Sequence, residues 1–127
     1  MTRSVLDSSA LLAYLKGEKG ADIVAALMGE AIISAVNYAE AVTKLIEKGM
    51  SLPSLREAIG VAEIEIVDFD RGLAEAAGEM FLTTKPFGLS LGDRACLALA
   101  RREGLPVFTG DRIWSKLALG LDIRLIR

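Results

Sequence analysis

The sequence predicts an α/β fold of three layers, α/β/α, in which helices cover both faces of a central parallel sheet of four or five strands. Short apolar runs alternate with longer amphipathic segments along nearly the whole chain. Glycines follow several of the helical segments, as is typical of helix C-termini. The 127 residues, 52% of them hydrophobic, are enough to bury one core, so we expect a single domain over residues 1–127.

Five apolar runs have the length and composition of buried strands: residues 4–7, 31–34, 64–69, 106–109 and 123–126. The segments between them have the apolar spacing of helices, which we expect over residues 9–16, 21–29, 37–48, 52–61, 71–83, 92–103 and 113–119. Strands that alternate with helices form βαβ units, in which the crossover helix returns each strand in the same direction. The sheet is therefore expected to be parallel, with helices on both faces.

Glycine and proline residues mark the ends of several expected helices and one expected loop. Helical segments are followed by Gly17, Gly49, Gly104 and Gly120. Pro86 and Gly88 interrupt the pattern between residues 83 and 89, because neither residue favours a continuing helix. We expect this segment to be an exposed loop directly before the helix over residues 92–103.

The composition excludes several classes of protein. The chain has no histidine, which excludes Ser-His-Asp and Cys-His catalytic groups and histidine-bound zinc. Cys96 is the only cysteine and lies in an apolar helix, so we expect a packed side chain rather than a nucleophile or a disulfide. The longest stretch without charge, residues 31–39, is shorter than the roughly 18 residues of a membrane span. We expect no membrane segment, no signal peptide and a cytoplasmic protein.

Four acidic residues are placed where they would meet in a parallel sheet. Asp7 ends the first expected strand and Asp111 follows the fourth. Glu40 and Asp93 lie about one turn into helices, and the spacing of Asp93 puts it on the apolar face of its helix, pointing inward. Because ligands in such folds bind at the carboxyl ends of the strands, we expect the four carboxylates at one edge of the sheet.

Each acid also has a local explanation. Asp7 and Asp111 precede helices and fit N-caps. Two further pairs have the spacing of a capping box, Asn37 with Glu40 and Ser90 with Asp93. Caps do not offset mutual repulsion, however, which is about 3 kcal/mol for two carboxylates at about 5 Å and an effective dielectric constant near 20. Ligands that are all oxygen select hard cations, so the pattern predicts bound Mg²⁺ or Mn²⁺ and metal-activated water that attacks a phosphodiester.

The charge of the chain is compatible with a nucleic-acid substrate. The net charge is −2, which two bound divalent cations would bring to +2. Candidate contacts to RNA phosphates lie in the loop and near the acids, at Lys85, Arg94, Arg112 and Lys116, although such side chains are most often solvated or ion-paired. Trp114 and Tyr38 offer rings on which a base can stack, but we expect both to pack in the interior.

Four ordered segments resemble the PIN-domain ribonucleases, specifically the VapC-type toxins of toxin–antitoxin pairs: residues 5–12, 37–40, 91–100 and 108–111. The resemblance implies a Mg²⁺- or Mn²⁺-dependent endoribonuclease whose acidic site serves both catalysis and metal binding and consists of Asp7, Glu40, Asp93 and Asp111. It implies that Ser9 and Thr109 support that site. It also implies a homodimer and a small antitoxin protein that covers the site.

Other readings of the motifs are weaker. A haloacid-dehalogenase-like phosphatase needs a second aspartate where this chain has Ser9, and a receiver domain needs an acidic pair where only Asp7 is present. No phosphate-binding or dinucleotide-binding glycine motif occurs. The alternative that stays open is a non-catalytic PIN-like module that binds RNA or protein. For an antitoxin or a second copy of the chain, the helices over residues 21–28 and 37–48 offer an apolar groove or dimer face, although we expect most of their apolar residues in the core.

Overall fold

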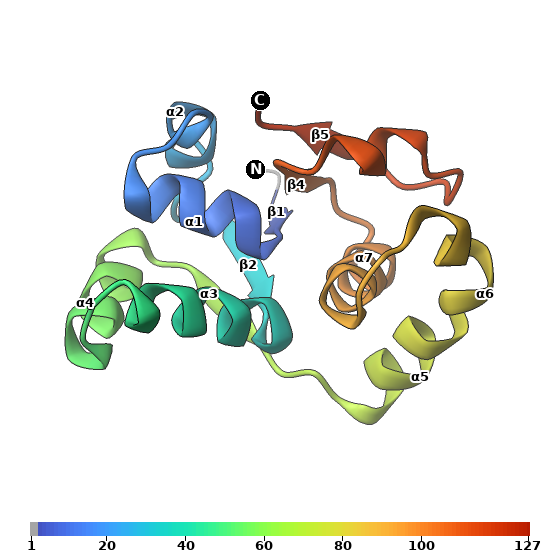
Figure 1. Ribbon diagram of the computed structural model, residues 1–127, viewed down its shortest axis with the longest axis horizontal. Helices are drawn as coiled ribbons and strands as arrows, with labels where there is room; N and C mark the ends of the chain where they lie inside the picture. Colours follow the sequence, from blue (N-terminus) through green and yellow to red (C-terminus); the bar gives the residue numbers. More distant parts are fainter. Residues whose placement is uncertain (1–2) are drawn as a thin grey trace.

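A five-stranded parallel sheet runs through the centre of the molecule, as Figure 1 shows. The computed structural model describes residues 3–127. The strands are β1 (Ser4–Leu6), β2 (Ala31–Ser34), β3 (Glu65–Val67), β4 (Val107–Thr109) and β5 (Ile123–Leu125). Their order across the sheet is β3-β2-β1-β4-β5, and every neighbouring pair is parallel. The predicted parallel sheet is confirmed, and strand order reverses between β1 and β4.

Helices cover both faces of this sheet, which confirms the predicted three layers (Figure 1). The α-helices are α1 (Ser8–Lys16), α2 (Ala21–Ala25), α3 (Ala35–Glu47), α4 (Leu52–Ala62), α5 (Arg71–Glu79), α6 (Phe81–Thr84) and α7 (Leu91–Glu103). Two short 3₁₀ helices, η1 (Lys85–Phe87) and η2 (Arg112–Lys116), complete the set within residues 3–127. No helix in that range is both long enough and apolar enough to span a bilayer.

Two neighbouring segments, expected as a helix and a loop, differ in kind from the structure. The helix expected over residues 71–83 divides at Met80, because the hydroxyls of Thr83 and Thr84 donate to the Met80 carbonyl at 3.2 and 2.8 Å. The expected loop over residues 83–89 is largely helical, with Thr84 and Leu89 buried.

The other differences are in length. The helix expected over residues 21–29 ends as α2 at Ala25, and the segment expected as a helix over 113–119 is the shorter η2. The strand expected over residues 64–69 is only Glu65–Val67, because the chain then turns toward the N-cap of α5.

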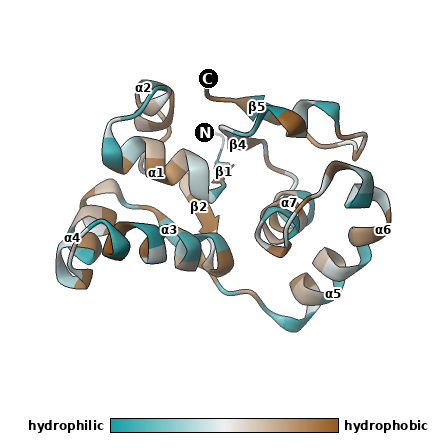
Figure 2. Cartoon of the chain, viewed as in Figure 1, coloured by the Kyte–Doolittle hydropathy of each residue, from teal (hydrophilic) through white to brown (hydrophobic). Residues whose placement is uncertain are grey.

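The sheet separates two apolar cores, because side chains alternate along each strand. Leu6, Ile33 and Phe108 face the layer of α1 to α4. The neighbouring residues Val5, Ile32 and Val107 face α5 and α7. Complete burial of each such side chain stabilises the fold by roughly 1.5–3 kcal/mol. In Figure 2 the hydrophobic colour follows β2 through this interior, whereas the connection leading into α5 is hydrophilic.

The two aromatic residues considered for stacking are placed as expected. Trp114 is fully buried in the core on the α5 and α7 side. Tyr38 is half-buried and packs against the other core. Both therefore contribute mainly to packing.

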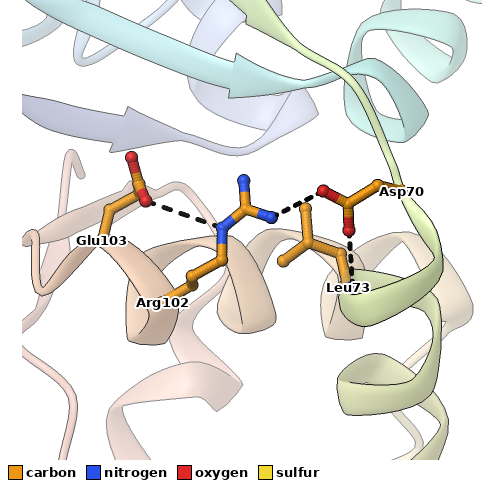
Figure 3. Close-up of polar contacts among 4 residues, drawn as sticks. All are labelled: Asp70, Leu73, Arg102 and Glu103. Carbon is orange, nitrogen blue, oxygen red and sulfur yellow. Dashed lines mark hydrogen bonds and ion pairs between the residues drawn. The ribbon is translucent and has the colours of Figure 1, made fainter.

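An aspartate and an arginine hold α5 against α7 (Figure 3). Asp70 caps α5 by accepting from the Leu73 amide at 2.9 Å, and it accepts from Arg102 of α7 at 2.8 Å. These hydrogen bonds hold the pKa of Asp70 below its usual range. Arg102 also contacts Glu103 at 3.5 Å. The contacts fix the path of the chain between β3 and the helix that carries Asp93.

Candidate active site at the carboxyl edge of the sheet

Asp7 is buried where strand order reverses, with 4% of its surface exposed. Its Oδ1 accepts from the Ala10 amide at 2.8 Å and from the Ser9 hydroxyl at 2.7 Å, so the predicted N-cap of α1 is confirmed. Its Oδ2 accepts from the Thr109 hydroxyl at 2.5 Å, which links the ends of β1 and β4. Burial raises the pKa of Asp7 even though these three hydrogen bonds oppose the rise, and the charge of Asp93 raises it further.

The hydroxyls of Ser9 and Thr109 each join Asp7 to the loop after β4. The Ser9 oxygen accepts from the Gly110 amide at 2.8 Å, and the Thr109 oxygen accepts from the Asp111 amide at 2.9 Å. Asp111 is exposed and caps η2 by accepting from the Ile113 amide at 3.0 Å, as predicted for an N-cap. Asp7 and the backbone of Asp111 are therefore part of one hydrogen-bonded unit.

Asp93 lies in the first turn of α7. It accepts from the Ser90 amide at 3.0 Å, while the Ser90 hydroxyl accepts from the Asp93 amide at 3.2 Å, so the predicted capping box is confirmed. The expectation that its side chain points into the core is wrong. The residue is half-buried, because the carboxylate turns back to the free amide at the helix end rather than along the apolar face.

Glu40 contacts the first turn of α7 from the opposite layer. The capping box expected between Asn37 and Glu40 is wrong, because α3 begins two residues before Asn37 and is capped by Ser34, which accepts from the Val36 amide at 3.2 Å. The side chain of Asn37 instead donates to the Glu40 carboxylate at 3.1 Å and to the Gly92 carbonyl at 2.9 Å. Glu40 is thereby held beside the residue that precedes Asp93.

Cys96 lies in the interior beneath these acids. It is fully buried, and its thiol donates weakly to the Leu6 carbonyl at 3.7 Å, which confirms the expected packed side chain. Burial raises the pKa of the Cys96 thiol well above its usual range, and the charges of Asp7, Asp93 and Glu40 raise it further. Asp7, Asp93 and Glu40 therefore all lie near enough to Cys96 for their charges to act on its thiol, and the backbone of Asp111 is connected to Asp7 through Thr109.

The donor set has the chemistry of a site for a hard divalent cation. The donors are carboxylate oxygens, which hard cations prefer. The Asp7 carboxylate is deeply buried and is affected by the negative charge of Asp93, so a bound cation would stabilise it. Within residues 3–127, no three of the acidic side chains stand in a ready-made metal-binding geometry. Asp93 and Asp111 accept hydrogen bonds at the starts of their own helices, so these two side chains would have to change rotamer to share an ion with Asp7.

The predicted phosphate contacts are not equivalent. Lys85, Arg112 and Lys116 are exposed, and Arg112 directly follows Asp111. Arg94 is half-buried, donates to the Ala77 carbonyl at 2.9 Å and lies 5.4 Å from the centre of the Phe81 ring. Arg94 therefore takes part in the packing of α7 on α5 and α6, which makes it the least available of the four.

Two residues near the acids were missed by sequence reasoning. The spacing of Asn37 predicts only a capping role, although Asn37 is the only side-chain amide in a chain without glutamine. Arg127 donates to the Lys19 carbonyl at 3.0 Å, and its guanidinium packs so closely on Gly110 that a Cβ there would lie 2.8 Å from Nη2. No local signal identifies Arg127, because its contact with the loop after β4 depends on how β5 pairs.

Solved structures share this fold at low sequence identity. A chain of a toxin–antitoxin complex from Klebsiella pneumoniae has a TM-score of 0.73 at 17% identity, over 98% of both chains. VapC20 from Mycobacterium tuberculosis, described as a sarcin–ricin loop cleaving toxin, has a TM-score of 0.74 at 18% identity, over 95% of this chain and 98% of its own. A chain of DNA-bound VapBC from Salmonella typhimurium has a TM-score of 0.70 at 19% identity, over 100% of both chains.

The sequence itself matches a family profile. No curated protein matches the chain in sequence. The profile of the PIN domain, however, matches residues 4–119, which include the four motif segments and the acids from Asp7 to Asp111. The resemblance inferred from the four motifs is confirmed by this match, and the chain belongs to the PIN-domain family.

Proposed function

We propose that this chain is a Mg²⁺- or Mn²⁺-dependent endoribonuclease, the toxin of a VapC-type toxin–antitoxin pair, with Asp7, Glu40, Asp93 and Asp111 as its metal-binding and catalytic acids. The proposal is supported by the position of Asp7 at the switch point of a PIN fold and by the contacts that link the segments carrying the other three acids to each other or to Asp7. Asp7 is joined through Thr109 to the backbone of Asp111, and Glu40 lies against Gly92, next to Asp93.

Each residue of the site has a task in this proposal. A bound divalent cation supplies Lewis acidity for attack of water on a phosphodiester and for stabilising the leaving oxygen. Ser9 and Thr109 hold the Asp7 carboxylate in one orientation, because each donates to a different carboxylate oxygen. The exposed Lys85, Arg112 and Lys116 are suited to RNA phosphates, which need only a cation within reach.

The assay for this function is cleavage of structured RNAs with Mg²⁺, with Mn²⁺ or with a chelator. The set includes an RNA hairpin with the sarcin–ricin loop sequence, since that loop is named for the similar VapC20. We expect metal-dependent cleavage that is lost in Asp7→Asn and in Asp93→Asn. Asp22→Asn, which changes an exposed acid on α2, is the matched control and is expected to cleave like wild type.

The alternative function, a non-catalytic PIN-like module that binds RNA or protein, predicts a different result. Such a module would bind RNA with similar affinity in wild type and in Asp7→Asn, and it would cleave none of the RNAs with either metal. This outcome would contradict the nuclease proposal.

The proposed partners follow from the similar structures, which come from toxin–antitoxin complexes. We propose an antitoxin protein that covers the acidic edge, a homodimer, and action in the cytoplasm, where the RNA would be met. Light scattering on the purified chain tests the dimer, and inhibition of RNA cleavage by a co-expressed antitoxin tests the complex. A monomer at micromolar concentration would contradict the dimer without affecting the proposal for the acids.

A further inference from the structure

Asn37 connects two helices that approach the acidic edge from opposite layers of the fold. We propose that Asn37 and Gly92 form a positioning unit that fixes the carboxylate of Glu40 for binding the divalent cation. This inference rests on the proposed function, because it assigns Glu40 to the metal site. Asn37 acts in it as a positioning residue, with no contact to substrate required.

The hydrogen bonds of Asn37 are directed to both helices. Its Nδ2 donates to Oε1 of Glu40 at 3.1 Å, within α3, and to the carbonyl of Gly92 at 2.9 Å, in α7. Both amide hydrogens are therefore used, and the side chain is 1% exposed. Since Gly92 precedes Asp93, the amide fixes Glu40 relative to the turn that carries a second acid.

Gly92 provides the space that this arrangement needs. A Cβ at this position would lie 2.5 and 2.6 Å from the two carboxylate oxygens of Glu40. Gly92 does not have a positive φ, so its backbone conformation is open to any residue. The requirement for glycine is therefore steric, and it comes from the Glu40 carboxylate itself.

The amide oxygen of Asn37 distinguishes this unit from ordinary packing. Oδ1 is buried and has no hydrogen-bond partner among residues 3–127. Leaving a buried acceptor unpaired costs free energy, which an apolar residue joining α3 to α7 would avoid. The two N–H groups of the Asn37 amide explain why asparagine occupies this position. An amide presents two hydrogens to oxygen acceptors, whereas an ionised aspartate of the same shape presents none.

The first test uses the fact that Asn37 is the only side-chain amide in the chain. Apart from any tag, a ¹H–¹⁵N spectrum of the full chain contains one carboxamide pair, and it belongs to Asn37. On titration with Mg²⁺ we expect this pair to shift with the same midpoint as the backbone amides of Asp7 and Asp93. A carboxamide pair that stays in place while those backbone signals shift would overturn the inference and leave the metal site intact.

The second test separates positioning from folding. Asn37→Asp removes both donors at constant shape, and Gly92→Ala displaces the Glu40 carboxylate. We expect each to weaken Mn²⁺ binding, measured by calorimetry, at least tenfold, and to lower kcat for RNA more than it raises KM. Thr43→Ala, on the exposed side of α3, and Gly60→Ala, in open space on α4, are the matched controls and should bind Mn²⁺ like wild type.

The outcomes separate the two proposals. If Gly92→Ala remains folded by circular dichroism and binds Mn²⁺ with wild-type affinity, the positioning unit is refuted, whether or not Asn37→Asp folds. If wild type itself binds neither Mn²⁺ nor Mg²⁺, the proposed function fails first and this inference fails with it. A loss of Mn²⁺ affinity in Gly92→Ala but not in Gly60→Ala supports the unit.

Discussion

Replacing Thr109 with valine tests whether the hydroxyl at the end of β4 holds the acidic edge together. Thr109 is fully buried, donates to Asp7 and accepts from the Asp111 amide. Valine keeps the shape and the preference for a strand, so the main change is loss of the hydroxyl. Asp7 would then be a buried carboxylate with two hydrogen bonds instead of three.

The expected loss of stability follows from the two hydrogen bonds of the Thr109 hydroxyl. A hydrogen bond to a charged group contributes about 1.5–3 kcal/mol, and the Asp111 amide, in an exposed residue, can turn to water at little cost. We therefore expect Thr109→Val to lower the free energy of unfolding by about 2–3 kcal/mol. At about 3–4 °C per kcal/mol for a chain of this size, Tm should fall by roughly 6–12 °C.

Urea denaturation at neutral pH without divalent metal measures this loss, with the fluorescence of buried Trp114 as the signal. Thr43→Val is the matched control, because its hydroxyl donates to a helix carbonyl on the exposed surface. The control should lose less than about 1 kcal/mol, which is the scale of helix propensity. If Thr109→Val loses no more than Thr43→Val, the hydroxyl does not stabilise Asp7, and our account of this edge is wrong.

Three further predictions concern groups at and away from the acids. Arg127→Ala should raise KM for RNA several-fold and leave Mn²⁺ affinity unchanged, because its guanidinium packs on Gly110 beside the proposed site; an unchanged KM would show that it contributes only packing. Asp70 has a lowered pKa in the fold, so it stabilises the fold above its unfolded pKa near 3.8, and this contribution is lost as the pH falls through the folded value. Asp70→Asn should therefore lower the urea midpoint more at pH 7 than at pH 2, and equal effects at both would contradict the assignment. Cys96 is fully buried with a raised pKa, so a thiol reagent at pH 8 should modify the native chain at least a hundredfold more slowly than the chain in urea; equal rates would refute its burial.

Much of the fold was predictable from local patterns. The apolar runs identified all five strands, because burial on both faces of a parallel sheet demands a continuous run of such residues. The caps at Asp7, Asp93 and Asp111 were predictable because an acid at a helix start meets free amides within three residues. The cap at Asn37 was not, because Ser34 offers the same chemistry three residues earlier and the end of β2 determines which is used.

The sequence by itself determined which residue types are available to the site: carboxylates and hydroxyls, without histidine and with one buried thiol. It also determined the order of strands and helices along the chain, since hydrophobic period is a local property. Only the tertiary structure decided that Thr109 reaches Asp7, that Arg127 covers Gly110 and that Asn37 joins Glu40 to α7. The Thr109–Asp7 contact spans 102 residues and the Asn37–Gly92 contact spans 55. All of these contacts depend on strand order and helix packing, which no short segment of the chain encodes.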